Sequence, residues 1–275
     1  MSGKLYVVGT PIGNLSDFSP RAIETLETVD FIAAEDTRVT MKLMNRFDIK
    51  RPIVSYYEHN MRDRGAKIID RILSGENCAV VSDAGMPAIS DPGEDLVRLA
   101  YENGIDVVSV PGPSAVITAL SVSGMSCKRF SFEGFLSANK SERRKALDEL
   151  KDEKRTMVFY EAPHKLVATL SDMKTAFGDR QIAVIKELTK IHETVLRVTL
   201  GEAVAHFAEN PPKGEYVLVV AGAEADETEV KMTLAQAVEY ARSCVDDGAS
   251  PTAAAKQAAV ISGLKKGEIY KQLVK

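Results

Sequence analysis

The first 113 residues alternate between two periodicities, and this alternation restricts the fold more than any other feature of the chain. Residues 62–73 and 94–102 place apolar side chains on one helical stripe. Short continuous apolar runs, typical of strands buried on both faces, occur at residues 5–9, 31–34, 53–57, 79–81 and 107–110. Strands that alternate with helices predict a parallel sheet with right-handed crossovers. Residues 1–113 are therefore predicted to form an α/β domain.

From residue 114 onward the pattern is looser, but it still predicts strands and helices. The strands are expected at residues 130–135, 156–160, 182–185, 195–200 and 216–220, and the helices at about 141–151, 164–176 and 202–209. The short link between the third and fourth of these strands indicates a hairpin, and hence a mixed sheet. A second α/β domain is predicted over residues 114–225.

The last part of the chain changes character. Residues 224–229 form an acidic, poorly patterned linker, and residues 230–275 are expected to form a small helical module. Ser250 and Pro251 are typical of a helix start. A small-residue face, a turn at 262–264 and a second helix from residue 266 follow; the face consists of Ala253, Ala254 and Ala258. This outline resembles a helix-turn-helix, although two amphipathic helices packed on the body would give the same pattern.

Composition excludes several classes of protein. Three widely spaced cysteines rule out a disulfide framework and any paired-cysteine metal site. The start of the chain enters a strand pattern directly, and no apolar run is long enough to span a bilayer. We therefore expect no signal peptide, no membrane partner and a cytoplasmic location. The net charge of −4 argues against nucleic-acid binding through the overall field, but residues 251–275 carry five lysines and one acid.

Glycine, proline and charged residues follow four of the predicted strands. These loops comprise residues 9–14, 35–38, 82–93 and 111–115. Glycine lets the backbone approach a ligand closely, and proline fixes the loop before the ligand arrives. Because parallel strands end at one edge of a sheet, where ligands of open α/β sheets bind, this edge is predicted to be a site. The dinucleotide fingerprint, the phosphate loop, zinc-ligand spacing and the G-x-S-x-G elbow are all missing from the sequence, so no metal is expected.

The same loops carry a resemblance to a known family. The segments 5–15, 34–38, 81–93 and 110–115 resemble the tetrapyrrole-methylase-like (class III) superfamily, and in particular its branch that methylates a cytidine ribose in small-subunit ribosomal RNA. Segments 132–135, 159–164, 186–190 and 214–218 continue the match in order, so that it covers nearly the whole chain except the last 45 or so residues. The resemblance implies a homodimer of two-domain α/β subunits that binds S-adenosyl-L-methionine in the cleft between the domains. Its implied partner is the small ribosomal subunit with its 16S rRNA.

Carried over position by position, the resemblance also implies which residues hold the methyl donor. Pro11 would close one side, the loop after the fourth strand would line the methionine or ribose portion, and residues of the second domain would cover the adenine. The implied donor-binding residues are Pro11, Asp83, Ala84, Gly85, Ile89, Ser114, Ala115, Tyr160, Tyr216, Val217 and Leu218.

Methyl transfer from a sulfonium is an in-line displacement, so positioning does much of the work, and the acceptor hydroxyl must lose a proton. The hypothesis for the group that assists names Asp36, Glu133, Lys186 and Glu187. Guanidinium and ammonium groups suit phosphate, and the predicted RNA contacts are Arg38, Arg143, Arg144, Lys256, Lys265, Lys266 and Lys271. Two alternatives stay open: a methylase of corrin or sirohaem precursors, and a non-catalytic nucleotide-sensing regulator.

Overall fold

The computed structural model describes residues 2–57, 61–224 and 232–274 of the chain. The chain divides into two compact units, Met1–Ala223 and Glu224–Lys275. Beyond Glu224, the predicted acidic linker lies outside the described residues, as does the predicted start of the helical module at residue 230. Both predicted α/β domains fall in the first unit, and the boundary at residues 113/114 stays a prediction.

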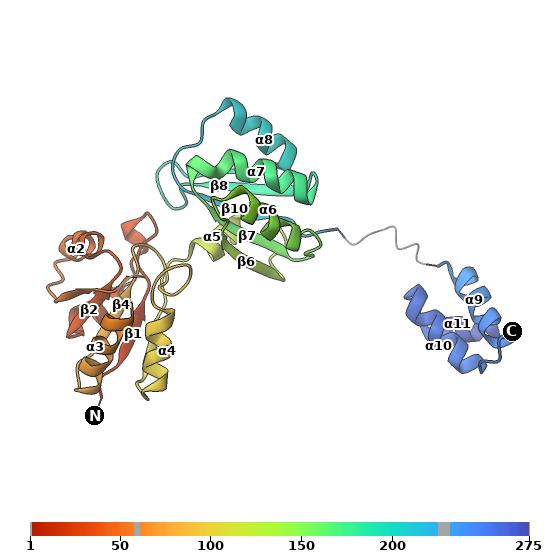
Figure 1. The fold of residues 1–275 in the computed structure, drawn as a ribbon, viewed down its shortest axis with the longest axis horizontal. Helices are drawn as coiled ribbons and strands as arrows, with labels where there is room; N and C mark the ends of the chain where they lie inside the picture. Colours follow the sequence, from red (N-terminus) through yellow and green to blue (C-terminus); the bar gives the residue numbers. More distant parts are fainter. Residues whose placement is uncertain (1, 58–60, 225–231, 275) are drawn as a thin grey trace. The chain divides into compact units, whose positions relative to one another are not determined.

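The first sheet is parallel throughout, as predicted (Figure 1). Its strands lie in the order β3-β2-β4-β1-β5. They are β1 (Leu5–Val8), β2 (Phe31–Ala34), β3 (Ile53–Ser55), β4 (Cys78–Val81) and β5 (Val107–Val110). Every residue of β2 and β4 is buried, which is why their sequences are continuous apolar runs without alternation.

Helices cover both faces of this sheet. On one face α1 (Pro20–Thr28) and α2 (Thr37–Arg46) bury Leu26 and Met44, and on the other α3 (Met61–Leu73) and α4 (Glu94–Glu102) bury Ile72 and Leu96. Helices α3 and α4 were predicted from the sequence, whereas α1 and α2 were not. The missed helices begin at side-chain caps, because Ser19 accepts a hydrogen bond from the Ala22 N–H and Asp36 accepts one from the Arg38 N–H.

The second sheet is mixed, and the predicted hairpin between its last two neighbours is confirmed. The strand order is β6-β7-β10-β8-β9, with β6 and β7 parallel and the other neighbours antiparallel. The strands are β6 (Phe130–Phe135), β7 (Thr156–Glu161), β8 (Gln181–Lys186), β9 (Thr194–Thr199) and β10 (Tyr216–Val220). Two α/β parts, one parallel and one mixed, therefore confirm the predicted fold class.

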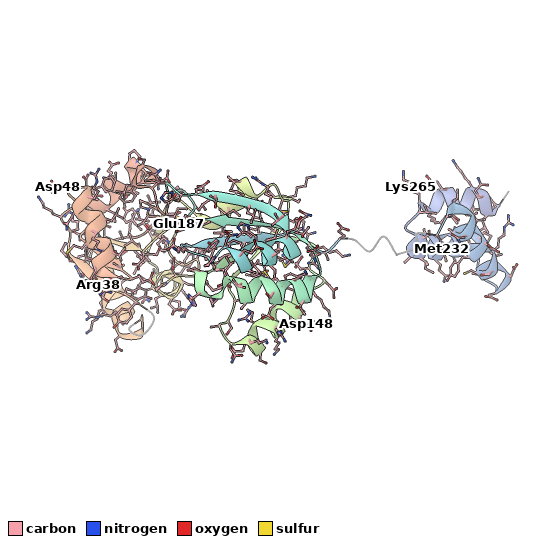
Figure 2. All side chains as sticks on the ribbon, turned by 90° about the horizontal axis from the view of Figure 1, so that it is seen from above. Arg38, Asp48, Asp148, Glu187, Met232 and Lys265 are labelled. Atoms are coloured by element: carbon pink, nitrogen blue, oxygen red, sulfur yellow. The ribbon has the colours of Figure 1, made fainter. Side chains whose placement is uncertain are left out.

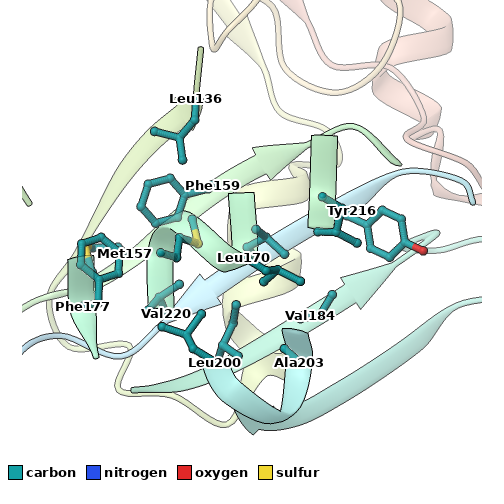
Figure 3. Close-up of a cluster of buried hydrophobic side chains, with 14 of the residues drawn as sticks. Leu136, Met157, Phe159, Leu170, Phe177, Val184, Leu200, Ala203, Tyr216 and Val220 are labelled. Carbon is teal, nitrogen blue, oxygen red and sulfur yellow. The ribbon is translucent and has the colours of Figure 1, made fainter. Parts of the chain in front are cut away.

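The two faces of the second sheet are buried by different helices. Helices α6 (Lys140–Glu149), α7 (Pro163–Phe177) and α8 (Leu200–Glu209) bury the larger core, which includes Phe159, Leu170 and Leu218 (Figure 3). On the other face α5 (Ala115–Ser123) packs against Val158, Ile185 and Val217. Because neighbouring residues of a strand point to opposite faces, Val217 and Leu218 belong to different cores.

The C-terminal unit is a bundle of three helices, α9 (Leu234–Asp246), α10 (Pro251–Ser262) and α11 (Lys266–Leu273). The predicted cap is confirmed, since Ser250 accepts a hydrogen bond from the Ala253 N–H. The predicted small-residue face needs one correction: Ala253 is exposed, and Ala255 is buried together with Ala254 and Ala258. The sequence did not predict helix α9.

Candidate active site

The loops at the carboxyl edge of the first sheet are locked together through their backbones. Thr10 and Gly85 exchange two backbone hydrogen bonds, of 2.9 and 3.1 Å between nitrogen and oxygen. Gly9 lies so close to Gly112 that a Cβ on Gly9 would stand 2.7 Å from the Gly112 Cα. Because only glycine permits this approach, the loops after β1, β4 and β5 are held in one arrangement at this edge.

A cavity of about 400 Å³ opens beside these loops and reaches the second sheet. This volume lies within the usual range for sites that bind small molecules or cofactors. From the first half, Ile12, Glu35, Asp83, Ala84, Ser90 and Asp91 line it. From the second half, its wall includes Ala115, Phe135, Tyr160, Glu161, Ile185, Leu188, Tyr216 and Val217. The predicted cleft between the two sheets is therefore present.

Three carboxyl groups face this cavity, and none of them forms an ion pair with another described residue. Partial burial raises the pKa of Asp91 to about 6, and burial with the charges of Asp91 and Asp83 raises the pKa of Glu35. Burial is likewise the main cause of the raised pKa of Asp83. Glu35 Oε2 is buried, and no described residue supplies it with a hydrogen bond. These groups make the cavity electronegative, so that it attracts a cationic ligand.

The loop that carries Asp91 is strained. Ala88 has a φ of 69° and Ser90 a φ of 62°, a left-handed conformation that side chains with a Cβ rarely adopt. Gly93, at a φ of 139°, allows the close contact with Ala88 that folds the loop back on itself. Strained non-glycine residues cluster at functional sites, where the surrounding structure fixes them. The strain is consistent with a loop shaped for a ligand.

The opposite wall of the cavity is aromatic and apolar. The Tyr160 ring lies edge-on to Phe132 and Phe135, with ring centroids 4.9 and 5.3 Å apart. Burial and the charge of Asp91 raise the pKa of Tyr160, which stays a neutral phenol at physiological pH. Val217 and Ile185 continue this wall. A flat heteroaromatic group would fit here, while a positively charged group would lie on the acidic side.

The structure brings together six of the eleven residues that the resemblance assigned to the donor. Asp83, Ala84, Ala115, Tyr160, Tyr216 and Val217 line the cavity. Pro11 lines an adjoining cavity, Gly85 belongs to the backbone bridge, and Ser114 caps α5. Ile89 is 48% exposed, and the fully buried Leu218 side chain belongs to the core on the helix-covered face. None of these five lines the donor cavity, and their predicted contacts with the donor stay predictions.

None of the four predicted proton acceptors is among the residues that line the cavity. Asp36 is the N-cap of α2, and its hydrogen bonds from Arg38 lower its pKa to about 2, which makes it a weak base. Glu133 lies where the register between β6 and β7 shifts. Lys186 follows Ile185, which faces the α5 side, and therefore points to the opposite face of the sheet.

Glu187 has a structural role in the loop that follows β8 (Figure 2). It accepts a hydrogen bond from the Glu215 N–H at 2.9 Å and forms an ion pair with Lys190 at 3.1 Å. The Glu215 N–H and the Lys190 ammonium lower the pKa of Glu187. Its carboxylate therefore stabilises the loop, and its predicted catalytic role stays without geometric support.

The predicted RNA contacts differ in availability. Arg143 is 5% exposed, and its guanidinium donates to Asp172 Oδ2 at 2.7 and 2.9 Å, so the structure corrects its assignment as a phosphate ligand. Arg144, with a side chain 54% exposed, shares Asp172 at 2.8 Å. Exposed side chains also belong to Arg38, Lys256, Lys265, Lys266 and Lys271 (Figure 2).

Sequence reasoning missed Glu35, Ser90, Asp91 and Phe135, all of which line the cavity. Glu35 and Asp91 lie in the loops 35–38 and 82–93 that the sequence predicted to form the site, but position in a loop does not reveal which carboxylate turns inward. The available signal was chain order: Glu35 is the residue directly after β2, so it continues the buried strand, whereas Asp36 already caps a helix.

Within residues 2–57, 61–224 and 232–274, no group of three or more histidine, cysteine or acidic side chains is arranged to hold a metal ion. In the same part of the chain no helix combines the length and apolarity required to cross a membrane.

Comparisons with known proteins agree with this geometry. Residues 4–204 match the family model described as Tetrapyrrole (Corrin/Porphyrin) Methylases. A Synechocystis protein named Ribosomal RNA small subunit methyltransferase I is 46% identical over 269 residues, which cover 98% of this chain and 96% of that relative. A Thermotoga maritima protein of the same name is 47% identical over 222 residues, which cover 81% of this chain and 100% of that relative. The structure of a cobalt precorrin-4 methyltransferase superposes with a TM-score of 0.60 at 16% identity, over 79% of this chain and 94% of that one.

The two-sheet architecture with a cavity at the strand ends is thus a methyltransferase fold. The chain belongs to the tetrapyrrole methylase family. The cofactor of this family is S-adenosyl-L-methionine, as the sequence predicted.

The cavity fits this cofactor chemically. S-adenosyl-L-methionine carries a sulfonium and an ammonium, which Glu35, Asp83 and Asp91 would stabilise. Its adenine is a flat heteroaromatic ring, which Tyr160 and Val217 would contact.

Proposed function

We propose that this protein transfers the methyl group of S-adenosyl-L-methionine to the 2′-hydroxyl of a cytidine ribose in 16S ribosomal RNA of the small subunit. The observation that carries the proposal is the alignment along 98% of the chain with a relative named for small-subunit rRNA methylation. The acidic cavity supports the donor part, because a cationic sulfonium is best held where carboxylates lack cations of their own.

The chain's residues would act mainly by positioning. S-adenosyl-L-methionine supplies an electrophilic methyl group, and the locked loops after β1, β4 and β5 would fix the donor in line with the attacking oxygen. The acceptor hydroxyl must pass its proton to a base. We assign this role to Asp91, since it lines the cavity and its pKa of about 6 leaves it ionised yet basic near neutrality. Asp36, Glu133, Lys186 and Glu187 remain weaker candidates for this role.

RNA binding is proposed for exposed cations of both units. Arg38 and Arg144 lie on the first unit and Lys256, Lys265, Lys266 and Lys271 on the second. Lys265 and Lys266 stand at the N-terminus of α11, where the helix dipole adds to their charge and favours phosphate. Arg143 is left out because Asp172 neutralises it in the core. A homodimer and a cytoplasmic location belong to the same proposal.

Methylation of a tetrapyrrole precursor is the second candidate, and the superposition with a precorrin methyltransferase favours it at the level of the fold. Those acceptors are polycarboxylates and would need a basic cavity. The cavity instead contains Glu35, Asp83 and Asp91, which would repel such an acceptor. Because RNA phosphates would be repelled as well, the charge alone does not decide between the two acceptors, and the relatives named for small-subunit rRNA methylation rank RNA above a tetrapyrrole.

The test is transfer of radiolabelled methyl from S-adenosyl-L-methionine to small ribosomal subunits isolated from a strain that lacks the gene. Naked rRNA and a tetrapyrrole precursor serve as parallel acceptors, and labelled nucleosides are then identified. Label in 2′-O-methylcytidine is the expected result. Label only in the tetrapyrrole would overturn the acceptor, and no label in any acceptor would favour a non-catalytic regulator.

A further inference from the structure

We propose that α2 and the loop after β1 form the groove that holds the RNA strand at the methylated nucleotide, with Lys42 and Arg46 on its phosphates. This groove, here called the α2 groove, comprises Leu15, Arg38, Val39, Met41, Lys42 and Arg46. The inference rests on the proposed function and adds the surface by which the body of the enzyme binds its acceptor.

The α2 groove adjoins the donor cavity. A second cavity, of about 420 Å³, lies between the loop after β1 and α2, and Asp83 lines both this cavity and the donor cavity. Its other lining residues include Pro11, Gly13, Leu15, Val39, Lys42 and Arg46. A nucleotide in this second cavity would therefore adjoin the donor cavity, so that its ribose hydroxyl could reach the donor for a direct transfer.

The charged side of the groove follows from helical spacing. Arg38, Lys42 and Arg46 are four residues apart, so they lie on one face of α2, while Thr40 and Met44 are buried beneath it. All three cations are exposed, and among the described residues no carboxylate lies within ion-pair distance of Lys42 or Arg46. A shallower hollow of about 270 Å³, lined by Arg38, Met41 and Lys42, extends the path along the helix.

A row of exposed cations, two of which form no ion pair with a described residue, is suited to a polyanion with regularly spaced phosphates. Arg38 is bound to Asp36 at 2.6 Å, so that pair marks the end of the row nearest the donor cavity. The net charge of the protein is −4, and the row therefore stands out from an overall negative field.

The groove also exposes large apolar side chains. Leu15 is 46% exposed, Val39 37% and Met41 51%, and the first two line the second cavity. Sequence-specific proteins bind RNA mostly through unpaired bases that contact apolar or aromatic side chains. Apolar walls beside cations therefore fit a single-stranded nucleotide, with its base against Leu15 and Val39 and its phosphates on Lys42 and Arg46.

A shorter relative favours an RNA-binding surface on the body of the enzyme. The Thermotoga maritima protein matches along its entire length yet covers 81% of this chain, so about a fifth of this chain has no counterpart there. The C-terminal unit, Glu224–Lys275, is of that size. A protein named for small-subunit rRNA methylation thus matches only about four fifths of this chain, which favours an RNA-binding surface besides the C-terminal lysines.

The test compares two double charge reversals in the full-length protein. Lys42→Glu/Arg46→Glu alters the α2 groove, and Arg64→Glu/Lys67→Glu makes the same change of charge on exposed positions of α3, which covers the opposite face of the first sheet. The readouts are the KM for small ribosomal subunits, the salt dependence of subunit binding, and the Kd for S-adenosyl-L-methionine by calorimetry.

We expect the groove variant to raise the KM for subunits at least tenfold while the donor Kd stays within twofold of wild type. The slope of log K against log salt should fall by about 1.4, because each lost phosphate contact with a single strand contributes about 0.7. The control variant should change each quantity less than twofold. Equal losses in both variants, or an unchanged KM in the groove variant, would overturn the α2 groove and leave the proposed function intact.

A third variant tests the apolar wall. Leu15→Ser/Val39→Ser should raise the KM for subunits without changing the salt slope, because it removes base contacts and no phosphate contact. A wild-type protein that transfers no methyl to subunits or rRNA would overturn the proposed function together with the groove. An altered donor Kd in the groove variant would instead assign Lys42 and Arg46 to the donor site.

Discussion

The carboxylates of the first α/β half and those of the second are stabilised in different ways. Glu35, Asp83 and Asp91 face a cavity, and within the described part of the chain none forms an ion pair. In the second half, Asp172 in the core and Glu161 at the cavity wall are almost fully buried, and each has a cation beside it, at 2.7 Å for Arg143 and 3.1 Å for Lys165.

The pKa shifts of these carboxyl groups follow this difference in pairing. Burial raises the pKa of Asp91 and Glu35 because little compensates it, whereas hydrogen bonds from Arg144 and Arg143 outweigh burial and lower the pKa of Asp172. Paired buried charges are typical of structural roles, and unpaired ones at a cavity are typical of binding and catalysis. The comparison therefore supports our proposal that the loops of the first sheet act on the donor and its acceptor, while the second sheet stabilises the wall opposite them.

The largest expected effect is on the structural side of this comparison. Asp172→Ala leaves the Arg143 guanidinium buried without its partner, and we expect the free energy of unfolding to fall by about 3–5 kcal/mol. Denaturant unfolding monitored by circular dichroism measures it. A loss below about 1 kcal/mol would mean that Arg143 reaches solvent and that the two halves differ less than described.

On the catalytic side, Asp91→Asn should lower kcat about 100-fold, which is the usual scale for removal of a general base. In the wild type, kcat should rise with pH through about 6, where Asp91 becomes ionised, and this rise of kcat with pH should disappear in the variant. Turnover of small subunits between pH 5 and 8 is the measurement. If Asp91→Asn kept the wild-type turnover and its rise with pH, the role of general base would return to Asp36 or Glu133.

The same substitution should make the protein more stable. The folded state raises the pKa of Asp91 from 3.8 to about 6, so it binds the proton more tightly than the unfolded chain does, and stability declines as pH rises through this range. Above pH 7, Asp91→Asn should therefore gain about 1 kcal/mol, discounted for partial exposure. The gain should shrink between pH 6 and 4. Thermal unfolding at several pH values checks it, and a loss of stability at pH 8 would contradict the comparison.

Arg144→Ala should have the smallest effect. Arg144 shares Asp172, but its side chain is 54% exposed and Arg143 keeps the carboxylate paired, so we expect a loss below about 1 kcal/mol. Unfolding under the same conditions as for Asp172→Ala allows the two losses of unfolding free energy to be compared directly. If Arg144→Ala destabilises as strongly as Asp172→Ala, the exposed pair contributes as much as the buried one.

Much of the fold could be predicted because strand and helix periods are local. All ten strands of the described residues were predicted with ends within three residues of those in the structure. The mixed second sheet followed from the short link between two of its strands. Helices α1, α2, α5 and α9 were not predicted. The starts of α1, α2 and α9 depend on caps at Ser19, Asp36 and Thr233, which a search for apolar stripes does not detect. Helix α5 is apolar around most of its circumference and so shows no single apolar stripe.

The sequence by itself determined the two sheets, the edge at which the loops gather, and the family with its methyl donor. Only the tertiary structure decided which charged side chains face the cavity. Glu35 and Asp36 are neighbours, yet one lines the cavity and the other caps α2. Arg143 and Asp172 are 29 residues apart, and their pairing removes an arginine that local reasoning had assigned to RNA. The physical reason is that periodicity specifies the face on which a side chain lies, whereas its partner, burial and pKa depend on contacts between distant segments.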